Sequence, residues 1–125
     1  MNEQFTTLLS ILLNSSTQAQ VFHRQVTGPG SYSAHKALGT YYDEIIDLFD
    51  GLVESYQGKN GLITNYTCGG VQQYKSNSDT IKYFENLVES VGKLRESVKE
   101  SYLQNQIDSV EELIYGTIYK LRFLS

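Results

Sequence analysis

The sequence predicts an all-α fold, a four-helix bundle with a crossover connection between the second and third helices. Apolar residues recur at spacings of three and four over most of the chain, which is the period of an amphipathic helix. Proline occurs once, at Pro29, and the alternation typical of strands is nowhere sustained. A chain of 125 residues, 40% of them hydrophobic, can bury one core, so we expect a single domain over residues 1–125.

The first two helices are predicted over residues 4–26 and from Ser31 or Ser33 to about residue 57. Gly28-Pro29-Gly30 separates them, because glycine and proline end helices. Either serine can cap the free amides of the second helix. The inner stripe of the first helix consists of Phe5, Leu8, Leu9, Leu12, Leu13, Ala19, Phe22 and Val26. That of the second helix consists of Leu38, Tyr42, Ile45, Ile46, Phe49 and Val53.

Residues 58–77 are rich in glycine, serine and asparagine, and they predict a connector. Its length exceeds what a tight turn between helices needs, and it fits a crossover between two halves of a bundle. We expect Ser78 or Asp79 to open the third helix. The fourth helix is expected to start near residues 106–108, where Asp108 and Glu111 have the spacing of a capping box. The apolar stripes of these helices are Ile81, Phe84, Leu87, Val88, Val91, Leu94 and Val98, then Val110, Leu113, Ile114, Ile118 and Leu121.

Composition narrows the range of partners. A net charge of −4, with basic residues scattered along the chain, offers no footprint for nucleic acid. The apolar run at residues 8–13 is too short to span a membrane and lacks the flanks of a signal peptide, so no membrane association is expected. Cys68 is the only cysteine, which excludes an internal disulfide and suits a reducing cytoplasm. We therefore expect a cytoplasmic protein in which Cys68 is inert.

Two histidines and two carboxylates form the pattern H-x11-H-x14-D-x3-E, at His23, His35, Asp50 and Glu54. Imidazole and carboxylate groups together are a ligand set for a divalent transition metal such as iron. Asp50 and Glu54 are one helical turn apart, so their carboxylates can converge on one point. Taken singly, each residue also has an ordinary explanation, as a packing histidine or as part of a solvated acidic helix edge. The joint pattern makes a metal site the sharper hypothesis.

Helix geometry restricts how these four residues can meet. His35 and Asp50 on one continuous helix lie about 22 Å apart, at a rise of about 1.5 Å per residue. They cannot share one ion within a single chain. A single site therefore requires a second copy of the chain, whose Asp50 and Glu54 approach the histidines of the first.

These residues carry a resemblance to a known family. The segment Phe22-His23-Arg24-Gln25-Val26-Thr27-Gly28-Pro29, followed by residues 33–38 and 41–54 with both carboxylates in register, resembles the first half of the Dps family of ferritin-like mini-ferritins. The resemblance covers about residues 5–57, and divergent members encoded by phages share this pattern. The second half of the chain offers only a compatible helical pattern.

The resemblance implies a ferritin-like bundle that binds iron, oxidises Fe(II) with peroxide or oxygen, and stores the product. In the Dps family this ferroxidase site is dinuclear in type and forms across a two-fold dimer interface, and the dimers assemble into a dodecamer. His23 and His35 would then bind iron as neutral imidazoles, and Asp50 and Glu54 of the neighbouring subunit would supply anionic oxygens. The resemblance thus implies a homo-oligomer, at least a two-fold dimer and up to a dodecamer, with iron or another divalent transition metal at the site.

Two positions depart from the family pattern. The family has an Asp one turn after the second histidine, where this chain has Gly39, and commonly a Trp after the first, where this chain has Arg24. Asp43, one turn later on the same face, is a candidate additional ligand. These departures, with ten tyrosines, which suit protein interfaces, keep open an alternative. In that alternative the chain is a degenerate ferritin-like bundle that acts as a structural or protein-binding module.

Overall fold

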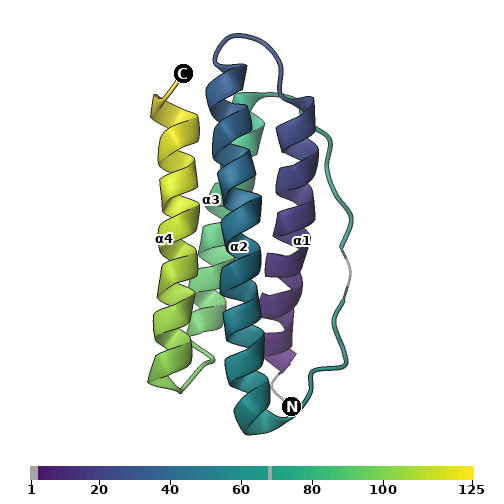
Figure 1. Ribbon diagram of the computed structural model, residues 1–125, viewed down its shortest axis with the longest axis vertical. Coiled ribbons are helices and arrows are strands. Elements are labelled where there is room, and N and C mark those ends of the chain that lie inside the picture. The colour runs from purple at the N-terminus through teal and green to yellow at the C-terminus, as the bar shows by residue number, and fades with distance from the viewer. Residues whose placement is uncertain (1–2, 68) are drawn as a thin grey trace.

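The computed structural model describes residues 3–67 and 69–125, and these residues form four helices packed side by side (Figure 1). The helices are α1 (Glu3–Gln25), α2 (Ser31–Asn60), α3 (Asn77–Arg95) and α4 (Ser101–Phe123). No strand occurs among the described residues. The predicted all-α four-helix bundle is therefore confirmed. Cys68, which we expected to be inert, lies outside the described residues.

The helices pack in a closed ring, with α1 against α2 and α3, and α4 against the same two helices. α1 and α4 run in one direction and α2 and α3 in the other, so every packed pair is antiparallel (Figure 1). The predicted stripes form one core, and its largest fully buried side chains include Phe5, Phe22, Tyr41 and Phe84. Leu13 is the exception, because its side chain is 41% exposed.

The helix ends correct several predictions. Neither Ser31 nor Ser33 caps α2, because its N-cap is Gly30 in the left-handed conformation, with φ 77°. The side chain of Ser76 caps α3 by accepting a hydrogen bond from the Asp79 amide. In both cases the chain enters the helix one or more residues before the predicted cap.

The expected start of α4 near residues 106–108 is wrong. The helix begins at Ser101, after α3 ends at Arg95, so Val98 lies in the turn between them. Asp108 does not cap a helix. Its carboxylate accepts from Arg95 Nε at 2.7 Å and joins the facing ends of α3 and α4. A polar residue at capping-box spacing therefore forms an ion pair between helices.

The connector from α2 to α3 lies along α1 and returns the chain to the opposite end of the bundle (Figure 1). Polar side chains of α1 hold its backbone. Ser10 Oγ accepts from the Thr67 amide, Asn14 donates to the carbonyls of Gly69 and Gly70, and Gln18 both donates to the Gln72 carbonyl and accepts from its amide. This polar ladder explains why Ser10 and Gln18 are buried.

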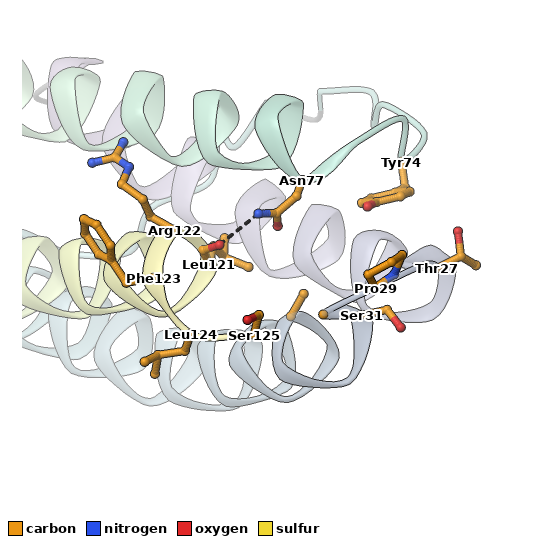
Figure 2. Close-up of a pocket in the computed structure, with 12 residues that line it drawn as sticks. Thr27, Pro29, Ser31, Tyr74, Asn77, Leu121, Arg122, Phe123, Leu124 and Ser125 are labelled. Atoms are coloured by element: carbon orange, nitrogen blue, oxygen red, sulfur yellow. Dashed lines mark hydrogen bonds between the residues drawn. The ribbon is translucent and has the colours of Figure 1, made fainter.

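Side-chain hydrogen bonds also close the end of the bundle at which α4 terminates. Asn77, at the start of α3, donates to the Leu121 carbonyl near the end of α4 at 2.8 Å (Figure 2).

Among residues 3–67 and 69–125, no helix is both long and apolar enough to cross a membrane.

Candidate functional site

The two histidines lie together where α1 meets α2. His23 is in the last turn of α1 and His35 in the second turn of α2, and the turn between them uses positive φ values at Gly28 and Gly30. Their imidazole rings stack with centroids 3.6 Å apart and planes inclined by 19°. Both residues are half-buried.

Reciprocal hydrogen bonds fix the two rings. His23 Nδ1 lies 2.6 Å from the His35 carbonyl oxygen, and His35 Nδ1 lies 2.7 Å from the His23 carbonyl oxygen. A carbonyl oxygen only accepts, so each Nδ1 carries the proton and donates. In the neutral imidazole, the lone pair is then on Nε2 in both rings. The backbone thereby selects the tautomer in which two Nε2 atoms are free to bind an electrophile.

Gly39 and Tyr42 complete the surroundings of His23. A Cβ at position 39 would lie 3.1 Å from His23 Cε1, which is tighter than ordinary van der Waals contact. The Tyr42 ring meets the His23 ring edge-on, with centroids 5.3 Å apart. Gly39 therefore has a packing reason within the chain, because its lack of a side chain makes room for the imidazole.

Arg24 does not pair with an acidic group among the described residues. Its guanidinium Nη1 donates to the Gln20 carbonyl of its own helix at 3.1 Å. The cation that follows His23 is thus held one turn back along α1.

The carboxylates lie elsewhere along α2. Asp43, Asp50 and Glu54 are all exposed, and none forms an ion pair with a described residue. Within one copy of the chain, no three His, Cys, Asp or Glu residues of the described part come close enough to hold a metal ion. One chain therefore brings two of the five candidate ligands together, the histidines, and leaves Asp43, Asp50 and Glu54 apart from them.

Asp50 has an aromatic neighbour from the connector. Burial, and then the nearby Asp50 carboxylate, raise the pKa of Tyr66, whose ring lies 6.3 Å from that of Phe49. From the sequence, Tyr42 was predicted as a core residue and not as a neighbour of His23, and Tyr66 was not linked to Asp50. The seven-residue interval from His35 to Tyr42 was a usable signal, because it places both on one helix face. No sequence signal links Tyr66 to Asp50, since the connector has no periodicity.

A pocket beside the turn between α1 and α2 is separate from these residues. Thr27, Pro29 and Ser31 line one side of it, and Leu124 and Ser125 line the other (Figure 2). None of the five candidate ligands lines this pocket.

Comparison with known proteins identifies one family. The model of DUF5856, a family of unknown function, matches residues 28–121. The chain belongs to DUF5856. The matched segment contains His35, Asp43, Asp50 and Glu54 of the DUF5856 chain, whereas His23 precedes it. No curated protein and no solved structure matches the chain significantly.

Proposed function

We propose that this protein is a Dps-like iron-binding protein that oxidises Fe(II) and stores the product at a dinuclear-type site between two copies of a ferritin-like bundle. One observation carries the proposal. His23 and His35 stack at the junction of α1 and α2, and the backbone holds both in the tautomer that leaves Nε2 unprotonated. A histidine that donates from Nδ1 to a carbonyl is oriented as metal-binding histidines usually are.

The donor set suits iron as a substrate. Neutral imidazoles bind Fe(II), and carboxylate oxygens are harder ligands that favour the ferric product and offset its added charge. Asp50 and Glu54 are exposed and have no ion pair among the described residues, so they are available to a second copy.

A two-fold axis would bring these groups together. Two copies of α2 that pair in antiparallel fashion place Asp50 and Glu54 of one copy beside His35 of the other when the axis passes halfway between them, near Asp43. The half-buried Tyr42, Ile46 and Val53 lie on the same side of α2 and would be covered in this dimer.

The reaction balances with hydrogen peroxide as the oxidant. Two Fe(II) ions each lose one electron, the O–O bond of one peroxide breaks, and two protons from solvent complete two water molecules. The protein residues hold the two ions at one place and neutralise part of the charge that develops. Dioxygen is the other oxidant that the proposal allows.

Anaerobic Fe(II) titration followed by peroxide addition tests the proposal. We expect the wild-type protein to bind Fe(II) and to oxidise it when peroxide is added, and the Asp50→Asn/Glu54→Gln variant to lose both properties. The matched control is Glu44→Gln/Asp47→Asn, which removes two exposed negative charges from the same helix. Equal iron binding by all three proteins would reject the site.

Mixed dimers test whether the site is shared. Neither His23→Ala/His35→Ala nor Asp50→Asn/Glu54→Gln has an intact site alone. A refolded equimolar mixture should recover about a quarter of wild-type activity, because half of the dimers are mixed and each has one intact site. If the mixture recovered no activity, the proposed site shared between two chains would be rejected. Asp43→Asn, assayed in parallel, assigns Asp43 to the site if iron binding falls.

A second candidate function is a protein-binding bundle without metal chemistry. It is favoured by the same reciprocal hydrogen bonds, which join α1 to α2 through protein atoms alone. This candidate predicts that replacement of both carboxylates leaves every property of the protein except its charge unchanged.

A further inference from the structure

The outer face of α4 carries exposed aromatic side chains near the C-terminal end of the helix. α4 lies across the bundle from the connector, with one face turned away from the other helices (Figure 1). On it Tyr119 is 55% exposed and Phe123 67% exposed, and their rings lie 5.7 Å apart. Large aromatic side chains adjacent on one helix face are typical of an interaction surface.

These aromatic residues belong to a row with alternating spacings of four and three, which places its members on one side of the helix. We call it the α4 seam, and it consists of Asn105, Ser109, Glu112, Gly116, Tyr119 and Phe123. Every one of these residues is exposed or half-exposed, so the row faces away from the core of the bundle. The residue in the middle of the seam, Gly116, has no side chain, whereas Tyr119 and Phe123 at its C-terminal end have large ones.

No contact within the chain requires a glycine at position 116. A glycine inside a helix costs about 1 kcal/mol in propensity relative to alanine. A Cβ at Gly39 or Gly51 would meet a neighbour at 3.1 or 3.2 Å, whereas a Cβ at Gly116 would meet nothing within 4 Å. A second helix lying across Gly116 would give the missing side chain a role, because it could approach the backbone closely.

The charges on this face indicate which helix that is. Asp108 and Arg122 form ion pairs with α3, but Glu112 and Lys120 form none with a described residue. These two charges lie four residues before and four residues after Gly116. An antiparallel copy of α4 centred on Gly116 therefore places each Glu112 beside the partner's Lys120 and each Phe123 over the partner's Ser109.

Other arrangements of two copies are less favourable. Parallel copies would set Glu112 against Glu112 and Lys120 against Lys120. An antiparallel pair centred near Glu112 would bring two carboxylates together at its middle. Like charges that face each other across an interface are repulsive. Charge complementarity thus selects a second copy of this chain in the antiparallel arrangement.

We propose that the α4 seam is a two-fold interface between two copies of the chain, with Gly116 at the crossing point and Glu112 paired to Lys120 of the partner subunit. It lies on a helix that the proposed iron site does not use. The two proposals stand or fall separately, because replacement of His23 or Asp50 leaves the α4 seam unchanged.

Sedimentation velocity over a concentration series tests the interface with a charge swap. Glu112→Lys and Lys120→Glu should each weaken association by about tenfold or more, because each replaces two attractive contacts with two repulsive ones. The double variant Glu112→Lys/Lys120→Glu should restore association to within about threefold of wild type. Equal particle mass for all four proteins, or weakening without restoration in the double variant, would overturn the proposal.

A steric variant provides the second measurement. Gly116→Leu should halve the particle mass while leaving the fold intact, because Gly116 is partly exposed and a Cβ at this position meets nothing within 4 Å in its own chain. Gly58→Leu is the matched control, since Gly58 also lies in a helix with nothing within 4 Å of its Cβ. Thermal unfolding of both variants verifies the fold. A wild-type protein that does not associate through α4, or equal effects of the two leucines, would reject the interface.

Discussion

At the scale of single residues, the histidine pair depends on where each ring carries its proton. The carbonyl partners require the proton on Nδ1 of both His23 and His35. We therefore expect long-range ¹H–¹⁵N correlation spectra of the metal-free protein at neutral pH to show Nδ1 protonated and Nε2 unprotonated in both rings. A spectrum with Nε2 protonated in either ring would remove the main support for a metal site here.

Gly39 has one interpretation from the sequence and another from the structure. By family resemblance it replaces a ligand, but in the structure it accommodates the His23 ring. We expect Gly58→Ala to stabilise the protein by about 0.5–1 kcal/mol through helix propensity. Gly39→Ala should fall short of this value by about 1 kcal/mol, because its methyl group displaces the ring. Urea denaturation of both variants measures the difference. Equal stabilities would show that the His23 ring moves aside without cost.

Two phenols, the buried Tyr41 and the half-buried Tyr83, make the stability of the fold sensitive to alkali. Burial raises the pKa of Tyr41 and of Tyr83 above the usual value, and the hydrogen bond to Ser15 opposes this in Tyr41. Because their pKa in the folded state exceeds that in the unfolded state, their stabilising contribution is complete below about pH 10 and is lost as pH rises further.

The expected loss is about 1.4 kcal/mol for each phenol at pH 11, because the unfolded chain ionises while the folded chain stays neutral. Tyr83→Phe should therefore lose less stability than wild type between pH 7 and pH 11. Chemical denaturation at the two pH values measures this, with Tyr32→Phe as the control for loss of an exposed hydroxyl. An unchanged pH dependence in Tyr83→Phe would contradict the prediction.

At the scale of elements, the connector depends on side chains of α1 rather than on its own apolar residues. Gln18 is 2% exposed, and its amide makes two hydrogen bonds to the backbone of Gln72, at 2.7 and 2.8 Å. We expect Gln18→Ala to destabilise the protein by about 1–3 kcal/mol, since it leaves both backbone groups without their partner.

Hydrogen exchange locates that effect. The Gln72 amide should exchange faster in Gln18→Ala, while amides in the core of α2 keep their protection until global unfolding. The control is Thr17→Ala at the neighbouring exposed position. Unchanged exchange at Gln72 would show that the ladder is incidental to the position of the connector.

The elements also show what sequence patterns can and cannot predict. Helix interiors were predictable because burial on one face imposes the 3.6-residue period, as with Phe84 and Val91 of α3. Helix ends were not, because they depend on local partners. Asp108 had the spacing of a cap, but the facing Arg95 recruited it, and Ser101 opened α4 without a side-chain cap. The burial of polar residues such as Gln18 could not be predicted from the sequence, because it results from the connector that packs against them.

At the scale of the whole molecule, the order of the helices makes it predictable that His23 and His35 lie close together, but not how their rings are arranged. The short turn after His23 made proximity to His35 foreseeable from chain length alone. The stacking and the exchange of hydrogen bonds with backbone carbonyls depend on how α1 and α2 pack. The carboxylates remain a prediction, because their proposed partners are on another copy of the chain.

The connector between α2 and α3 is attached to α1 at several points along its length. Between its attachments at Gly69 and Tyr74, five residues span the distance that α1 covers between Asn14 and Gln25. Eleven helical residues rise about 16 Å, and five fully extended residues reach about 16 Å. Gln18 attaches Gln72 between these two points, so the length of this segment and its side-chain bonds together set how far along α1 the third helix begins.

Deletion of Val71 should therefore disrupt the fold more than a longer connector does. The shortened chain has to shift its bonds along α1 or release the Asn14 or the Gln25 attachment, so we expect a loss of about 1–3 kcal/mol in the free energy of unfolding. Insertion of two glycines after Gly61, before the attached part begins, should change it by less than about 1 kcal/mol, because loop closure depends weakly on length. Urea denaturation of both variants compares them. If the two changes had equal effects, the extended segment would not set the position of α3.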